Sequence, residues 1–238
     1  MRHGHTNLCV TFYDSREMVI KKYPHAAALL GELESKCRYP LFFNVDGTKL
    51  QEYKSLFKTP FDLVFFTFPH SGVPNSDPYS IRSNGDLLRQ FLSSVHHVLA
   101  PNGQVQMTLK NGDVYDKWNF QGIAEEVTRL QYEGNKIMRK DLFPGYHHRL
   151  TKGMQGTMKE VKDKMGATVH RFSQMQSSNQ SSMDSPPMFS SLDVFVLGPE
   201  SEDDPSRKKR KRSENSWLHP SDEWVKGKIL QFCSCTVA

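Results

Sequence analysis

Cysteine is scarce in this chain of 238 residues, and no Gly-x-Gly-x-x-Gly turn occurs anywhere in it. The four cysteines, Cys9, Cys37, Cys233 and Cys235, are too few and too scattered for a disulfide framework. The Cys-x-Cys pair near the end of the sequence has no second pair and no paired histidine, so we expect no metal site. This pattern indicates a reducing, intracellular compartment.

Long apolar runs are also lacking. No stretch approaches the roughly 18 apolar residues of a membrane-spanning helix, and the start of the sequence has no signal-peptide core. We therefore expect no membrane partner. The charge balance, 31 Lys and Arg against 26 Asp and Glu, gives a net charge of +5, which permits an anionic partner without requiring one.

The most informative stretch is the apolar run of residues 63–68, which ends in Pro69-His70-Ser71-Gly72. Both faces of this run are apolar, which is typical of a central parallel strand covered by helices on both sides. Pro69 cannot donate to a sheet ladder and ends the strand. Polar groups then follow at the carboxyl end, where open α/β sheets bind ligands. The alternative is a core strand followed by an ordinary turn.

The rest of the chain alternates between predicted strands and helices. We expect strands at 6–13, 40–45 and 104–109, a β-leaning stretch at 136–143, helices at 16–23, 25–36, 49–58, 85–99 and 117–130, and a turn at 100–103. Ser15 is the expected cap of the first helix. This alternation predicts a doubly wound α/β fold.

Two of the predicted strands are followed by an aspartate, Asp14 and Asp46. In nucleotide-binding α/β folds, an acid at this position accepts hydrogen bonds from ribose hydroxyls or an adenine amine. A helix cap is the alternative for either residue. Two acids in the same position favour a nucleoside-containing cofactor.

The last third of the chain differs in composition. Residues 174–188 are rich in Ser, Gln, Asn and Met and predict a disordered insertion, whereas 189–197 have strand character. We place the domain at 1–198 and a charged, largely disordered tail at 199–238. The basic run 207–212 has the form of a nuclear or nucleolar import signal, with a solvated linker, and hence a cytoplasmic protein, as the alternative.

Several blocks of this sequence together resemble one family, the large-subunit rRNA (uridine-N3)-methyltransferase-like domain. The blocks, in chain order, are Thr11-Phe12-Tyr13-Asp14-Ser15, Tyr23-Pro24, Asn44-Val45-Asp46-Gly47-Thr48, residues 61–72, residues 103–110 with Trp118, and residues 143–153. A similar domain is found at the N-terminus of ferredoxin-fold anticodon-binding domain-containing proteins. The resemblance covers about two thirds of the chain, from Thr6 to Gly153.

The resemblance implies a class I methyltransferase with a Rossmann-like sheet and S-adenosylmethionine as cofactor. Asp14 would contact the cofactor ribose, Asp46 would lie near the adenine, and Phe68, Pro69 and His70 would line the methyl-transfer site. N3 is on the Watson–Crick edge of uracil, so the base must be unpaired and turned out of its stack. A histidine at a strand end could accept the N3 proton or orient the base, and Phe68 or Tyr146 could stack on it.

The resemblance also implies rRNA as the partner. A basic stretch with an aromatic residue suits RNA phosphates and unstacked bases, and its predicted RNA-binding residues are Tyr146, His147, His148, Arg149 and Lys152. Basic residues further along, up to Arg171, alternate with acids and fit an ordinary helix surface equally well.

The sequence departs from the family at two places. The family opens with a strand and a Gly-rich turn that holds the methionine part of the cofactor, whereas this sequence begins directly at the expected second strand. We therefore expect a sheet without its first strand and first helix, with an apolar gap, and weak or no cofactor binding by this chain. Thr67 stands where similar members carry Asn, and a hydroxyl holds a base edge less firmly than an amide. A non-catalytic RNA- or ribosome-assembly-binding module is the alternative function, and a dehydrogenase ranks last.

Overall fold

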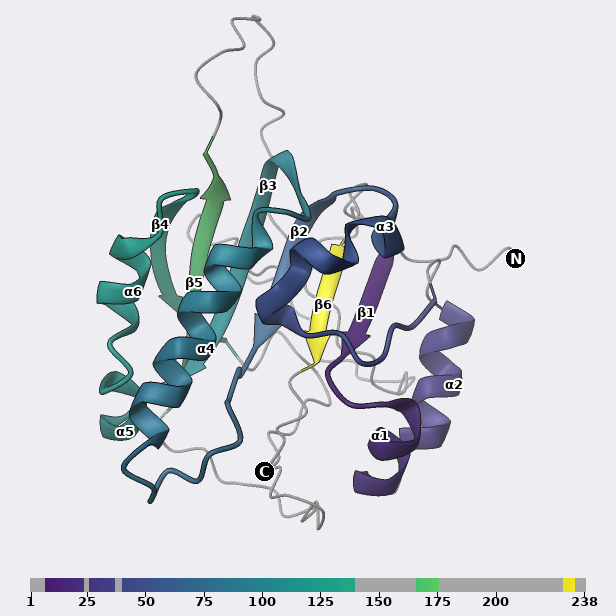
Figure 1. The fold of residues 1–238 in the computed structure, drawn as a ribbon, viewed down its shortest axis with the longest axis horizontal. Coiled ribbons are helices and arrows are strands. Elements are labelled where there is room, and N and C mark those ends of the chain that lie inside the picture. The colour runs from purple at the N-terminus through teal and green to yellow at the C-terminus, as the bar shows by residue number, and fades with distance from the viewer. Residues whose placement is uncertain (1–6, 24–25, 37–39, 140–165, 176–228, 234–238) are drawn as a thin grey trace, which may run out of the picture.

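The computed structural model describes residues 7–23, 26–36, 40–139, 166–175 and 229–233. Their strands form one six-stranded sheet in the order β1, β6, β2, β3, β5, β4 (Figure 1). The strands are β1 (Leu8–Phe12), β2 (Phe61–Thr67), β3 (Leu99–Lys110), β4 (Leu130–Ile137), β5 (Ala167–Gln174) and β6 (Ile229–Cys233). The first four strands in the sheet order are parallel, and β5 is antiparallel to both of its neighbours. The predicted Rossmann-like α/β class is confirmed.

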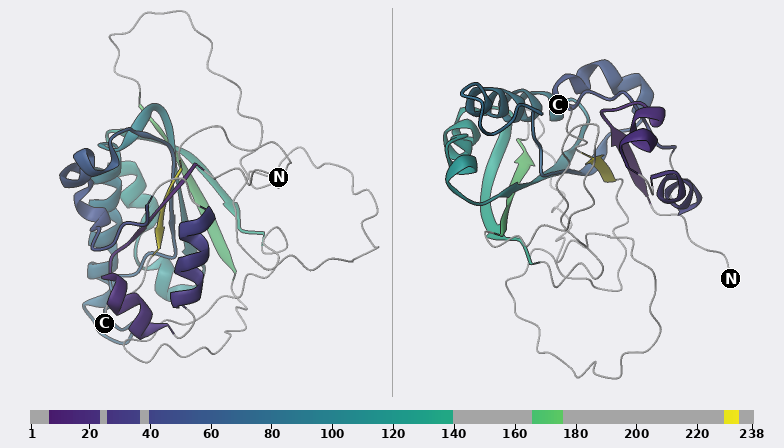
Figure 2. Two further views of the ribbon diagram at one scale, coloured as in Figure 1. Left: turned by 90° about the vertical axis from the view of Figure 1, so that its right-hand side faces the viewer. Right: turned by 90° about the horizontal axis from the view of Figure 1, so that it is seen from below.

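The helices are α1 (Arg16–Lys22), α2 (Ala26–Lys36), the 3-10 helix η1 (Gly47–Tyr53), α3 (Lys54–Phe57), α4 (Ser80–Val95), α5 (Asp113–Asp116) and α6 (Phe120–Glu126). Helices α3, α4 and α6 lie on one face of the sheet, and α1 and α2 lie against the other face at its β1 edge (Figure 2). Helices α1 and α2 pack against Val10 and Phe12 of β1, whereas α3, α4 and α6 share a core with Cys9 on the other face of that strand. Within the described ranges, no helix is both long and apolar enough to cross a membrane.

Strand β2 is the predicted central strand. It pairs in parallel with β6 on one side and β3 on the other. Val64 and Phe66 face the α4 core, where the Phe66 ring centroid lies 4.5 Å from that of Phe91, and Leu63 and Phe65 are also buried. Both faces of this strand are therefore covered, which explains why its sequence is apolar throughout.

The beginning of α1 follows the predicted capping. Ser15 has extended backbone, and its Oγ accepts a hydrogen bond from the Met18 N–H at 3.2 Å. This contact satisfies one of the amide donors that a helix start leaves without an intrahelical partner.

The expected turn at 100–103 lies inside β3 as an irregularity. Phe61 is in register with Leu99, but Leu63 is in register with Gln104, so the intervening residues of β3 bulge out of the ladder. Gly103 fits this close approach because a Cβ there would lie 2.9 Å from the Phe61 and Ala100 carbonyl oxygens. Turn-forming residues here produce a bulge because the flanking residues pair with one neighbouring strand.

Two expected elements are shorter than predicted. The helix predicted over 117–130 begins only at Phe120, since Asn119 has a left-handed φ of 54°, and Leu130 is already the first residue of β4. The strand predicted over 40–45 is reduced to a single bridge between Phe42 and Thr11. Asn44, with a left-handed φ of 57°, interrupts the extended backbone after that bridge.

Strand β5 was not predicted from the sequence. It inserts antiparallel between β3 and β4, with Phe172 opposite Val105 and Val169 opposite Thr108. Val169 and Phe172 are buried, although they are separated by the polar His170 and Arg171. This interrupted apolar pattern hides the strand from an analysis of periodicity.

The prediction of a gap in the sheet is wrong. Strand β6, from residues that the sequence analysis assigned to the tail, lies between β1 and β2. Its run Ile-Leu-Gln-Phe-Cys is rich in strand-forming residues, and the edges of β1 and β2 supply pairing groups for it on both sides. The predicted strand at 189–197, the basic run 207–212 and most of the predicted insertion lie outside the described residues.

His170 should make the stability of the fold depend on pH. Burial lowers its pKa from 6.5 to about 4, and its Nδ1 is hydrogen-bonded to the Tyr132 hydroxyl at 3.0 Å. Between pH 6.5 and 4 the unfolded chain therefore binds a proton that the folded chain does not, so stability falls as the pH falls through this window. We expect a loss of roughly 3 kcal/mol from this group in urea unfolding.

The substitution His170→Gln isolates this contribution because glutamine does not titrate. The difference in unfolding free energy between pH 7 and pH 4 should be smaller in this variant than in the parent chain. Equal pH dependence in the two chains would contradict the assignment.

Candidate cofactor and substrate site

The carboxyl ends of β1, β6 and β2 meet at one edge of the sheet. The segment after Phe42 returns to this edge, where the Val45 N–H donates to the Phe12 carbonyl at 3.0 Å and the Asn44 N–H donates to the Asp14 carbonyl at 3.3 Å. The structure thus brings the two strand-end aspartates, Asp14 and Asp46, to the same edge as the loop that follows β2.

Asp14 is enclosed in a buried ion pair. Its two carboxylate oxygens accept hydrogen bonds from Lys22 Nζ of α1 at 3.1 and 2.9 Å. The exposed fractions of the two side chains are only 7% for Asp14 and 6% for Lys22. Sequence reasoning missed Lys22, because a lysine in the last turn of a helix is usually exposed to solvent. The pair fixes α1 against the end of β1.

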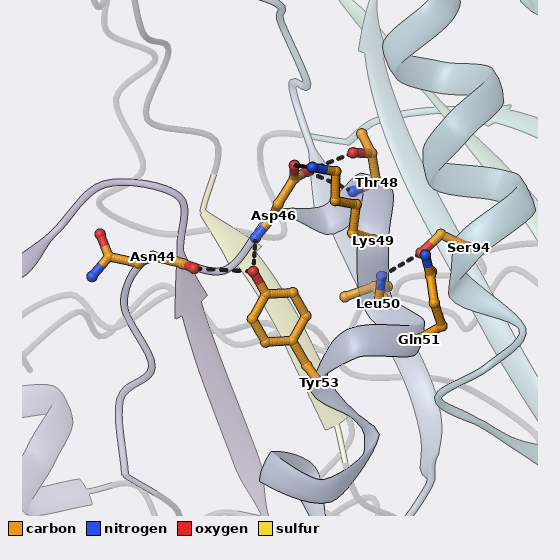
Figure 3. A network of polar contacts seen from close by, with 8 residues as sticks. All are labelled: Asn44, Asp46, Thr48, Lys49, Leu50, Gln51, Tyr53 and Ser94. Atoms are coloured by element: carbon orange, nitrogen blue, oxygen red, sulfur yellow. Dashed lines mark hydrogen bonds and ion pairs between the residues drawn. The ribbon is translucent and has the colours of Figure 1, made fainter.

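Asp46 has a different environment at the same edge (Figure 3). Its Oδ1 accepts hydrogen bonds from the Thr48 N–H at 2.9 Å and the Thr48 hydroxyl at 2.6 Å, which caps η1. Its Oδ2 lies 3.9 Å from Lys49 Nζ, and 29% of the side chain is exposed. The capping alternative is therefore correct for Oδ1 of Asp46. Among the described residues, Oδ2 contacts only Lys49, at 3.9 Å.

A polar network holds Asp46 in place (Figure 3). The Tyr53 hydroxyl accepts from the Asp46 N–H at 3.1 Å and donates to the Asn44 carbonyl at 3.2 Å. Further along η1, the Leu50 N–H donates to Ser94 Oγ of α4 at 2.6 Å. These bonds tie the segment that carries Asp46 to the main core of the domain.

Phe68 directly follows β2 in a strained conformation. Its φ is 53°, in the left-handed region that a non-glycine residue rarely adopts. Its N–H donates to the Thr108 carbonyl at 2.8 Å, which continues the pairing with β3. The side chain is half-buried, and Pro69 after it is buried. The strained turn directs the chain out of the sheet at the candidate site.

His70 has both ring nitrogens engaged. Its Nδ1 accepts from the Gly72 N–H at 3.0 Å, and its Nε2 lies 3.2 Å from Asn75 Oδ1, an acceptor. The Nε2–H tautomer satisfies both contacts. Burial lowers the pKa of His70, and the nearby Lys110 charge acts in the same direction, so the ring is neutral at pH 7.

A buried polar network supports this loop from α4. Asn84 is fully buried; its Oδ1 accepts from the Ser71 N–H at 2.8 Å and its Nδ2 donates to the Ser80 carbonyl at 2.8 Å. Ser80 Oγ in turn lies 3.4 Å from Asn75 Oδ1. The sequence analysis began this helix only at residue 85 and therefore missed Asn84, which lies inside α4 (Ser80–Val95) and is not a capping residue.

Trp118 packs beside the same loop. Its ring meets that of His70 edge to face, with centroids 5.7 Å apart, and 3% of the residue is exposed. Its Nε1 donor has no hydrogen-bond acceptor within the described part of the chain. A buried donor of this kind is costly unless a ligand or water accepts from it.

The remaining predicted site residues cannot be located in this geometry. The predicted RNA-binding residues Tyr146, His147, His148, Arg149 and Lys152 lie outside the described residues. Across the described ranges, no group of His, Cys, Asp and Glu side chains is arranged to hold a metal ion. The described site therefore consists of acceptor oxygens on one side and aromatic and imidazole rings on the other.

The fold and this site define a Rossmann-like α/β protein with a polar edge at the carboxyl ends of its parallel strands. The family model described as BMT5-like, rRNA (uridine-N3-)-methyltransferase BTM5-like, matches residues 1–150. The chain belongs to this family.

Two individual relatives share 30% and 24% of their aligned residues with this chain. The chain is 30% identical over 151 residues to heavy metal-associated isoprenylated plant protein 41 of Arabidopsis thaliana, covering 60% of this chain and 28% of that protein. It is 24% identical over 210 residues to the 25S rRNA (uridine(2634)-N(3))-methyltransferase of Saccharomyces cerevisiae, covering 66% and 62%. The chain thus spans less than two thirds of the length of either relative.

Among solved structures, a methyltransferase homolog protein from Pyrococcus horikoshii is similar at a TM-score of 0.40. The two are 11% identical, and the match covers 72% of this chain and 62% of that one.

The Asp14–Lys22 pair should be strongly coupled in its effect on stability. Lys22→Met leaves a buried carboxylate without its partner, and we expect a loss of about 3–5 kcal/mol in urea unfolding. The double variant Asp14→Asn/Lys22→Met removes both charges and should be more stable than Lys22→Met alone. The exposed pair between Arg16 of α1 and Glu34 of α2 provides the control, because Arg16→Met should change stability much less. Additive losses in the double variant would contradict a coupled buried pair.

The tautomer of His70 can be tested by histidine ¹H–¹⁵N NMR. At pH 7 its spectrum should correspond to a neutral ring with the proton on Nε2, and its pKa should lie below 6.5. Asn75→Ala should lower this pKa further, because Asn75 Oδ1 stabilises the protonated ring. A pKa at or above 6.5 in the parent chain, or an unchanged value in the variant, would refute this account.

Proposed function

We propose that this chain is an S-adenosylmethionine-dependent methyltransferase domain that acts on N3 of a uridine in large-subunit rRNA. The observation that carries the proposal is the convergence of Asp46, Asp14 and the loop of residues 68–72 at one sheet edge, in a member of this family. The printed name of the yeast relative, a 25S rRNA uridine methyltransferase, supports the choice of substrate.

The donors and acceptors at this edge fit the cofactor in part. Asp46, with Oδ2 accessible and outside hydrogen-bond distance of Lys49, suits the hydroxyl or amine groups of an adenosine. Asp14 fits less well, because both of its oxygens already accept from Lys22 in a nearly closed environment. The bound cofactor would supply an electrophilic methyl group for attack by a nitrogen of the base. We therefore assign the adenosine contact to Asp46 and a supporting role to Asp14.

The substrate side of the site would be formed by the loop after β2. A uridine turned out of its stack would lie against the half-buried Phe68. His70 would orient this loop. For it to accept the N3 proton, its bond from the Gly72 N–H would first have to open, so we favour orientation over proton transfer.

The same function suggests the location of the protein. Methylation of rRNA during ribosome assembly, together with the basic run 207–212, fits the nucleus or nucleolus. The cytoplasm is the alternative.

A second candidate is a non-catalytic RNA- or ribosome-assembly-binding module. The enclosure of Asp14 by Lys22 favours it, because this carboxylate is then structural. The binder would bind rRNA in a salt-sensitive manner that does not depend on the cofactor.

Calorimetric titration with S-adenosylhomocysteine tests the proposal. We expect micromolar binding that Asp46→Ala weakens at least about tenfold, which corresponds to the loss of about 1.4 kcal/mol. Asp62→Ala is the matched control, because this exposed aspartate lies near the start of β2, at the opposite end of the strand.

Methyl transfer from labelled S-adenosylmethionine to unmodified large-subunit rRNA is the second measurement. A folded chain that gives neither binding heat nor transfer would exclude the enzyme. Salt-sensitive binding to rRNA by that same chain would then establish the non-catalytic module.

A further inference from the structure

Strand β6 is paired on both sides over its entire length. Ile229 to Cys233 run parallel to Leu8–Phe12 of β1, and the same five residues run parallel to residues 63–67 of β2. Among the described strands, β6 alone lies between β1 and β2. The middle of the sheet is thus supplied by a segment from the far end of the chain (Figure 1).

The two strands that β6 joins pack mainly against different helices, although Cys9 of β1 also lies in the α4 core. Strand β1 packs with α1 and α2 through Val10, Phe12 and Leu30, and it leads directly into Asp14. Strand β2 packs with α4 and leads into the loop of residues 68–72. Each strand therefore leads into one side of the candidate site.

The backbone at this junction cannot be left unpaired. Thr11 and Val64, on the strands facing β6, have exposed fractions of 1% and 0%. Without β6 the N–H and C=O groups along the facing edges of β1 and β2 would lose their partners, which is costly wherever this backbone stays buried. Adjacent strands are about 4.8 Å apart, which sets β1 and β2 at roughly 10 Å.

The register of β6 with β1 and β2 shows which residues of the two strands lie side by side. Cys233, the last residue of β6, is in register with Phe12 and with Thr67. Phe12 lies just before Asp14, and Thr67 immediately precedes the strained Phe68. The end of β6 is therefore level with the points at which the chain leaves the sheet on both sides of the site.

We propose that β6 is a positioning strand for cofactor binding: residues 229–233 hold the Asp14 side and the Phe68–His70 side of the site at a fixed spacing. This inference rests on the proposed function for its cofactor part. The affinity for S-adenosylmethionine is accordingly controlled by a segment remote in sequence from every predicted site residue.

The test uses the full chain with substitutions at Gln231, the middle residue of β6, in register with Val10 and Phe65. Gln231→Pro removes an N–H from a strand that is paired on both sides. Gln231→Val is the matched control, because it keeps the N–H and has a high strand propensity. Gln231→Gly provides a milder change should the proline variant fail to fold.

The first readout is hydrogen exchange measured by mass spectrometry, which does not depend on any activity. In the parent chain, the amides of residues 229–233 should be protected. Gln231→Pro should accelerate exchange in Leu8–Phe12 and in residues 63–67 by about tenfold or more, while Ala167–Gln174 change little. Unprotected amides in β6, or unchanged exchange in β1 and β2, would overturn the proposal.

The second readout is binding of S-adenosylhomocysteine. We expect about tenfold weaker binding in Gln231→Pro and parental binding in Gln231→Val. Parental affinity in Gln231→Pro, with β1 and β2 loosened, overturns this proposal and leaves the proposed function intact. A parent chain with protected β6 amides and no binding removes the proposed function and the cofactor role of β6 with it.

Discussion

The structure depends on backbone hydrogen bonding at the centre of its sheet. Strands β1 and β2 are buried, and each needs a parallel neighbour on the side that faces the other. Strand β6 meets this requirement for both at once. Because the site lies where these strands end, the same pairing that completes the core also sets the spacing of the candidate binding groups.

Two aspartates at one sheet edge have distinct physical roles. Asp14 is buried with Lys22, so its charge is neutralised within the protein and it acts as an anchor between β1 and α1. Asp46 uses one oxygen to cap η1 and keeps the other near solvent. On the other side, Asn75 contacts the His70 ring, and Asn84 of α4 holds the backbone of the next residue, Ser71. Trp118 packs edge to face against the His70 ring. The edge thus combines rigid support with a small number of accessible groups.

Much of this arrangement was predicted from local patterns. The apolar run before Pro69 predicted a central parallel strand, and Ser15 predicted the start of α1, because both signals depend on neighbouring residues alone. Patterns failed where a distant partner decided the outcome. Residues 100–103 form a bulge because Phe61 pairs with Leu99, and β5 was missed because its buried residues are interrupted by His170 and Arg171.

The sequence by itself determined the fold class, the family blocks and the positions of Asp14 and His70 shortly after strands, because each follows from periodicity or from a short motif. Only the tertiary structure decided which of these groups are available. The burial of Asp14 by Lys22, the fixed tautomer of His70 and the insertion of β6 all require residues that are separated along the chain to meet in space. These contacts depend on how whole helices and strands pack together, which a short stretch of sequence does not determine.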